Sequence, residues 1–306
     1  MLPKSISALD NMGNPHPGKL PPRLITLLGI LCVFASALFF YFATAMIRWS
    51  QAEVDISSSF FAFARFVLGF FVVLAVMGLR GRGPTPRRYR LLIGRAVYNM
   101  IAVFCFYQAV ALTSLAEGNI LNMTYPIFLA LISWFVLKEQ RDMISLLMVG
   151  AAFAGIWLIL APADIRPDIL NLWGLASGVT AALAILYLNM SRRYHDTETI
   201  LFYMFGLGGI MMYLFDHTRI YWPDPREVYY LLICSLFGVG GQYLLTLGFR
   251  YVTAVEGSII SSSRILIAAI LGPWIALDPP LAISGWIGAL LIFLANVVLA
   301  VRKTRH

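Results

Sequence analysis

The sequence predicts an all-α polytopic membrane protein of ten transmembrane helices, arranged as two five-helix repeats of inverted topology with both termini in the cytoplasm. Of the 306 residues, 60% are hydrophobic and 12% are charged, against about 45–50% and about 25% in soluble domains. The apolar residues fall in runs of about 20, the length that a helix needs to cross a bilayer core. A short phrase also occurs twice, at 114–120 and 253–259, and each copy leads into an apolar segment.

The apolar runs define the predicted spans and the parts of the chain outside them. Residues 1–23 are rich in Pro, Gly and Asn and are expected to form a disordered cytoplasmic tail, and residues 302–306 form a basic tail. Loops that contain breakers such as Pro84 and Pro162 separate the spans. The predicted spans cover approximately residues 24–47, 55–78, 91–112, 117–136, 142–160, 171–190, 199–215, 227–249, 255–276 and 282–301.

The repeat divides the chain into a first five-helix unit, 24–160, and a second, 171–301. Glu117 and Glu256 occupy equivalent places in the two copies, 139 positions apart (256 − 117). Because five is an odd number, the second unit enters the membrane from the opposite side. Inverted repeats of this kind are typical of secondary transporters, whose solute site lies near the midplane between the repeats.

The basic residues predict the orientation. The two tails and the loops on their side of the membrane contain 16 Lys and Arg residues, whereas the opposite loops contain four. The positive-inside rule therefore places both termini in the cytoplasm. We expect a multi-pass protein of the plasma (inner) membrane. This topology explains the net charge of +8 without a nucleic-acid partner; the expected partners are the lipid bilayer and a small-molecule solute, and a homodimer is compatible with the sequence.

Several segments resemble the drug/metabolite transporter superfamily, in particular its EamA-type members. They are residues 111–117, the helix 119–136 with Tyr125-Pro126 at its centre, and the sequence Leu-Lys-Glu at 137–139. Arg65 resembles an arginine often present in the second span of that family. The resemblance implies a ten-helix carrier that moves small organic solutes, often amino acids or other metabolites, outward.

Polar residues in the middle of the fourth and ninth spans are the first candidates for solute binding. Asn119, Asn122 and Tyr125 align at the offset of 139 with Ser258, Ser261 and Arg264. The alternative is that the small hydroxyl residues serve helix packing.

Pro126 lacks an amide hydrogen, so it is expected to kink the fourth helix and to leave the carbonyl of Asn122 free.

Arg65 and Arg264 lie well inside predicted spans, where a charge costs at least about 2.5–3.5 kcal/mol. Because no carboxylate shares their depth, we expect a positive cavity that binds an anionic group of the solute, such as a carboxylate. The alternative is that Arg65 ties helices together by bonding backbone carbonyls or Glu117. Arg95 lies about a turn inside the third span, and we expect it to extend to the cytoplasmic surface.

Further cavity residues are expected from spans one, three and eight: Tyr41, Tyr98, Tyr107, Gln108 and Gln242.

The repeated glutamates Glu117 and Glu256 each follow a hydroxyl residue by three positions, Ser114 and Thr253. This spacing matches a capping box at a helix start. Coupling of a proton to transport is the alternative role for these two carboxylates.

Other residue types limit the function. The three cysteines lie singly in predicted spans, and the four histidines lie in tails or loops. We therefore expect no disulfide and no metal site, and no cofactor is expected. No phosphate loop or nucleophile with a nearby base indicates an enzyme. The sequence therefore favours a secondary transporter that exports a small carboxylate-bearing metabolite by alternating access. A non-transporting membrane scaffold or subunit and a carrier for cationic or nucleoside-type solutes are the alternatives.

Overall fold

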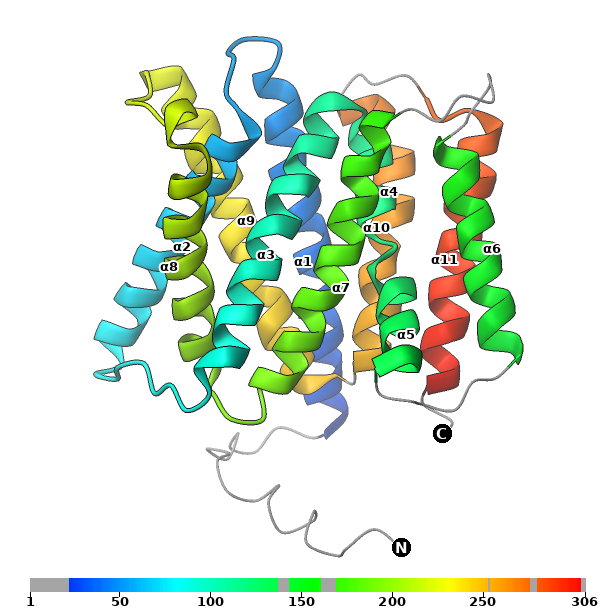
Figure 1. Cartoon of the computed structure of the whole chain (residues 1–306), viewed down its shortest axis with the longest axis horizontal. Helices are drawn as coiled ribbons and strands as arrows, with labels where there is room; N and C mark the ends of the chain where they lie inside the picture. The colour runs from blue at the N-terminus through cyan, green and yellow to red at the C-terminus, as the bar shows by residue number, and fades with distance from the viewer. Residues whose placement is uncertain (1–21, 137–142, 161–168, 253, 276–279, 304–306) are drawn as a thin grey trace, which may run out of the picture.

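Helices account for nearly all of the chain that the computed structural model describes, which is residues 22–136, 143–160, 169–252, 254–275 and 280–303 (Figure 1). No β-strand occurs in these residues. The α-helices are α1 Pro22–Ser50, α2 Ser58–Leu79, α3 Tyr89–Leu112, α4 Leu115–Asn122, α5 Tyr125–Val136, α6 Met143–Leu160, α7 Leu172–Ser191, α8 Thr197–Asp216, α9 Pro225–Tyr251, α10 Ala254–Ile275 and α11 Ile283–Lys303. Two 3-10 turns, η1 Ile169–Asn171 and η2 His217–Arg219, precede α7 and follow α8.

The helix ends agree with the predicted spans to within three residues, except that α4 and α5 share the fourth span. Six segments, in α1, α2, α3, α7, α8 and α9, are long and apolar enough to cross a membrane, and α6, α10 and α11 contain shorter apolar stretches. Large apolar side chains such as Phe71, Trp157 and Ile270 are exposed on the outside of the bundle, as lipid contact requires. The number of crossings and the orientation of the termini stay predictions.

The fourth span breaks where a kink was predicted. Helix α4 ends at Asn122, and α5 begins at Tyr125, so Pro126 lies in the first turn of a new helix, where its missing amide hydrogen costs nothing. The break frees the carbonyl of Met123, which accepts a hydrogen bond of 2.9 Å from the side-chain amide of Asn296 on α11. A buried backbone carbonyl in a membrane requires such a partner, so α11 stabilises the break.

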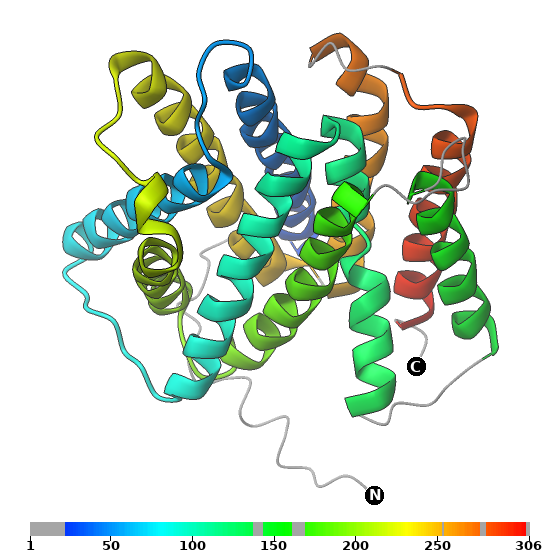
Figure 2. The same ribbon diagram turned by 45° about the horizontal axis from the view of Figure 1, so that its top comes forward.

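The two halves of the chain interlock. Helix α1 packs along α9, α3 along α7, α2 against α8 and α6 against α11. The sequence repeat makes α1 equivalent to α7 and α3 equivalent to α9. The contact of α1 with α9 is therefore equivalent to the contact of α7 with α3. Figure 1 shows α1 and α7 running in opposite directions, and the start of α1 and the end of α11 at the same end of the bundle. Figure 2 shows the α6–α11 pair at one edge and the α2–α8 pair at the other.

The α6–α11 pair depends on two glycines that face each other. A Cβ atom at Gly155 would lie 2.7 Å from the carbonyl oxygen of Gly288, and a Cβ atom at Gly288 would lie 2.6 Å from that of Gly155. Contacts this close exist only because neither residue has a side chain, and such pairs of small residues are a common means of helix association in membranes.

We predict that Gly155→Ala lowers the free energy of unfolding by about 1–3 kcal/mol, because the new methyl group would press on backbone that cannot move aside. Gly150→Ala on the same helix is the control, since a Cβ atom there meets nothing within 4 Å, and alanine is the better helix former. Unfolding in detergent measures both. Equal stability of the two variants would contradict this account of the α6–α11 contact.

Candidate functional site

A small, partly open cavity lies where the break between α4 and α5 faces α1, α2, α3, α7, α9 and α10. Its volume is about 100 Å³, less than the roughly 300–1,000 Å³ of a typical ligand pocket. A metabolite would therefore require the surrounding helices to part. The polar residues that line the cavity are Arg65, Arg95, Asn99, Asn122, Gln242 and Arg264.

Arg65 enters the cavity from α2. That helix begins where the side chain of Ser57 accepts a hydrogen bond from the amide of Phe60, and Arg65 lies two turns further on. Its side chain is only 3% exposed. One guanidinium nitrogen donates a hydrogen bond of 3.1 Å to the hydroxyl of Tyr107, and the guanidinium carbon lies 5.3 Å from the centre of the Phe40 ring, within the range of a cation–π contact.

A glycine makes room for this arginine. A Cβ atom at Gly238 on α9 would lie 2.8 Å from Cδ of Arg65 and 3.3 Å from the hydroxyl oxygen of Tyr107. The group that approaches the backbone of α9 at Gly238 is therefore the candidate binding residue itself.

Arg264 enters from α10 and is held by an amide. Its guanidinium donates to Oδ1 of Asn122, and the amide nitrogen of Asn122 donates to the hydroxyl of Ser177 on α7 at 3.0 Å. The guanidinium carbon lies 5.1 Å from the centre of the Phe106 ring. Asn122 therefore links α10 and α7 at the end of α4, beside the helix break.

The expectation for Arg95 was wrong. Its side chain is 2% exposed and lines the cavity, so it does not extend to the membrane surface. Helix α3 begins at Tyr89, earlier than predicted, which places Arg95 six residues inside it. The face that carries Arg95 also carries Asn99, Val103 and Phe106, which line the same cavity.

The cavity is consequently positive. Three guanidinium groups share it, and no Asp or Glu is among the described residues that line it. The described residues also contain no group of three or more His, Cys, Asp or Glu that could hold a metal ion. Such a site can bind an anionic group by charge-assisted hydrogen bonds, for which arginine offers paired donors.

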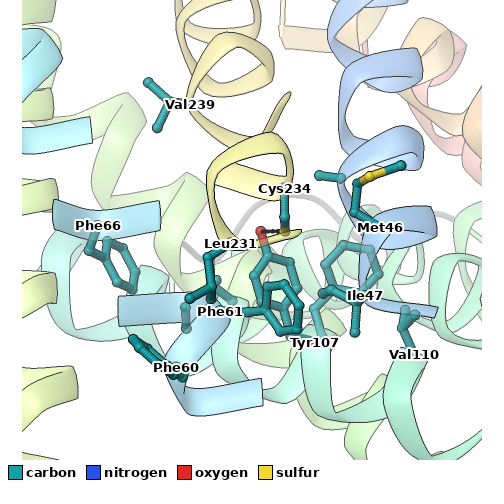
Figure 3. Close-up of a cluster of buried hydrophobic side chains, with 14 of the residues drawn as sticks. Met46, Ile47, Phe60, Phe61, Phe66, Tyr107, Val110, Leu231, Cys234 and Val239 are labelled. Carbon is teal, nitrogen blue, oxygen red and sulfur yellow. Dashed lines mark hydrogen bonds between the residues drawn. The ribbon is translucent and has the colours of Figure 1, made fainter. Parts of the chain in front are cut away.

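A cluster of buried apolar side chains closes the bundle beyond Arg65, toward the ends where α2 begins and α3 ends. Figure 3 shows this cluster, in which the hydroxyl of Tyr107 meets the thiol of Cys234 at 3.8 Å. We call Met46, Ile47, Phe61, Tyr107, Val110, Leu231 and Cys234 the closing cluster; all are buried. Tyr107 belongs both to this cluster and to the partners of Arg65, so it connects the cavity to its closed end.

Of the residues predicted to bind solute, the structure brings Arg65, Asn122, Gln242 and Arg264 together on the cavity. Tyr107 contacts it through Arg65. The others lie outside its lining. They are Tyr41, Tyr98, Gln108, Asn119, Tyr125 and Ser261.

Two of these outlying residues, Asn119 and Tyr98, have evident packing roles. The side-chain nitrogen of Asn119 donates to Thr44 on α1 at 3.2 Å and to the carbonyl of Leu115 at 2.8 Å. Tyr98 packs against Tyr187, with ring centres 5.4 Å apart. These contacts tie α4 to α1 and α3 to α7.

Glu117 lies apart from the central cavity. The hydroxyl of Ser114 accepts a hydrogen bond of 3.1 Å from the amide of Glu117 and so caps α4, which is one half of the predicted capping box. The Glu117 side chain lines a separate pocket of about 320 Å³ together with Arg48 and residues before α11. Thr253 and the side chain of Glu256 lie outside the described residues.

Arg95 and Asn99 are the polar cavity residues that sequence reasoning missed. They lie four positions apart, the spacing that places two side chains on one helix face. A polar pair with that spacing inside an apolar span was the available signal.

Comparison with known proteins identifies the family. The model of the EamA-like transporter family matches residues 27–161 and again residues 169–301. The chain belongs to the EamA-like transporter family. Its apolar helices and its membership of this family make it an integral membrane protein of a transporter family, as the resemblance in the sequence predicted.

Curated relatives of this EamA-like chain are transporters by name. An uncharacterized transporter of Helicobacter pylori is 27% identical over 222 residues, which cover 69% of this chain and 74% of that protein. Human solute carrier family 35 member G1 is 24% identical over 302 residues, which cover 90% of this chain and 80% of that protein. The pseudopaline exporter CntI of Pseudomonas aeruginosa is 24% identical over 233 residues, which cover 74% of this chain and 80% of that protein.

A solved crystal structure has the same fold. It superposes with a TM-score of 0.60 at 18% identity, and the superposed region covers 92% of this chain and 98% of the solved one. At this identity the similarity shows the fold alone.

We predict that Gly238→Ala displaces Arg65 from Tyr107, because the added methyl group would occupy the space of a flexible side chain. Tyr107→Phe should lower the free energy of unfolding of the unmodified chain by about 1.5–3 kcal/mol, the worth of a hydrogen bond to a charged group. In the Gly238→Ala background, where that bond is already lost, Tyr107→Phe should cost at least about 0.5 kcal/mol less.

Unfolding in detergent of the two single variants and the double variant measures this coupling. Gly78→Ala on α2 is the matched background, since a Cβ atom there meets nothing within 4 Å and the cost of Tyr107→Phe should be unchanged. The same cost in all backgrounds would show that Gly238 does not position Arg65.

Proposed function

We propose that this protein is a secondary carrier that exports a small carboxylate-bearing metabolite, an amino acid or another organic anion, across the plasma membrane. The observation that supports the carboxylate is the set of three buried guanidiniums without an acidic residue in the described lining of the cavity. Buried charges normally have a partner, and a solute anion would provide one. The name of CntI describes that relative as an exporter, which favours outward transport here.

Alternating access is the proposed mechanism. The cavity is small and the closing cluster packs between it and one end of the bundle, so a solute could pass to that end only as helices move. In the proposed arrangement, ten spans form two inverted repeats with cytoplasmic termini, and the units that move are the interlocked halves. Rocking of one half against the other would open each side in turn.

The alternatives differ in what they require of the cavity. A carrier for cationic solutes would need a carboxylate or a comparable acceptor at the site, where the described lining offers three cations. A non-transporting scaffold or subunit needs no cavity at all. Transport by the purified protein separates the scaffold from both carriers.

Transport in reconstituted liposomes tests the proposal. We expect that at least one of succinate, lactate and alanine is transported at least about tenfold faster than its carboxamide analogue, because a charge-assisted hydrogen bond is worth about 1.5–3 kcal/mol. Arg264→Gln should reduce that transport by a similar factor. Arg226→Gln is the matched control, since Arg226 is exposed and remote from the cavity.

Equal transport of each carboxylate and its amide would contradict the anion site. If the folded protein transports none of these solutes, nor cationic or nucleoside solutes, the scaffold is the better description.

A further inference from the structure

Arg95 differs from the other two arginines in having no partner among the described residues. Arg65 bonds Tyr107 and packs on Phe40, and Arg264 bonds Asn122 and packs on Phe106. No hydrogen bond, ion pair or ring contact joins Arg95 to a described residue. The buried Nε lacks an acceptor in all three arginines, but Arg65 and Arg264 each have another guanidinium nitrogen that donates a hydrogen bond. At 2% exposure, this guanidinium is shielded from bulk solvent and has no acceptor among the described residues.

Asn99 repeats the pattern one turn further along α3. Its side chain is 7% exposed, and its amide nitrogen has no hydrogen-bond partner among the described residues. A charged donor and a neutral donor therefore lie side by side on one helix face and line the same cavity. Unsatisfied buried donors are costly, and together these two could be satisfied by the oxygens of one anionic group.

Arg65 and Arg95 enter the cavity from opposite directions. Arg65 lies seven residues after the start of α2 and Arg95 six residues after the start of α3. The two helices run antiparallel (Figure 1), so the two side chains approach from the two ends of the bundle. A single carboxylate bound at Arg65 and Arg264 would leave the charge of Arg95 uncompensated.

We propose that the cavity selects solutes with at least two anionic groups, and that Arg95, with Asn99, binds the second group. This inference rests on the proposed anion carrier and makes it specific. In a carrier of this kind, one anionic end of the solute binds Arg65 and Arg264 and the other binds Arg95. Arg95 then determines specificity by charge number, since a monoanion satisfies the first pair alone.

Three solutes of nearly equal size test the charge number: succinate with two carboxylates, succinamate with one, and succinamide with none. At neutral pH all carboxyl groups are ionised. Their apparent affinities follow from the rise in unfolding temperature that each causes in the purified full-length protein. We expect succinate to bind at least about tenfold more tightly than succinamate, the factor that one added charge-assisted hydrogen bond contributes.

Arg95→Gln should reduce this preference to within about twofold, because the second carboxylate then loses the guanidinium that distinguishes it from an amide. Arg90→Gln makes the same change on an exposed position of the same helix and should alter neither affinity. Arg95→Lys keeps the charge and should keep a preference for succinate. If Arg95→Gln does not fold, the three solutes on the unmodified chain still test the charge number.

The outcomes separate the two proposals. Equal binding of succinate and succinamate would overturn the second anion site and leave the carboxylate carrier standing. A preference for succinate that Arg95→Gln leaves intact would overturn the role of Arg95. Failure of both anions to bind better than succinamide would also overturn the second anion site, and the proposed function would then fall only if lactate and alanine show no advantage over their amides in the transport test.

Discussion

Burial of three like charges in one small space is the constraint on which the centre of this molecule depends. Guanidinium groups that lose water need other partners, and the described lining offers them no carboxylate. The chain instead uses weaker compensations around Arg65 and Arg264: the faces of Phe40 and Phe106, the hydroxyl of Tyr107 and the amide oxygen of Asn122. Neutral partners hold the cations in place without cancelling their charge, which leaves the cavity attractive to an anion.

The break in the fourth span belongs to the same arrangement. It ends α4 at Asn122, whose side chain then connects Arg264 to α7. The carbonyl that the break exposes is satisfied by Asn296 from α11. Irregular backbone is tolerated at membrane depth only where protein or a cavity surrounds it, and here both are present. The helix break therefore helps to build the polar site, because it places Asn122 at the end of α4 beside Arg264.

Much of this could be predicted because polar residues stand out in an apolar chain. The helix positions follow from run length, and Arg65, Asn122, Gln242 and Arg264 follow from their depth. Arg95 was misassigned for two reasons. Its depth was counted from a predicted start at residue 91, whereas α3 begins two residues earlier, at Tyr89. The direction of its side chain also depends on tertiary packing. Likewise, a proline permits either a kink or a break, and the choice depends on Asn296, 170 positions after Pro126 (296 − 126).

The closing cluster also gives the molecule a natural reporter of its own state. The thiol of Cys234 has no exposed surface, and Cys105 on α3 is 5% exposed. A thiol shielded in this way does not meet a water-borne alkylating reagent while the cluster is packed, whereas separation of Tyr107 from Cys234 would admit water to the sulfur. The rate of modification at Cys234 thus records how often this end of the bundle opens, with no engineered residue required.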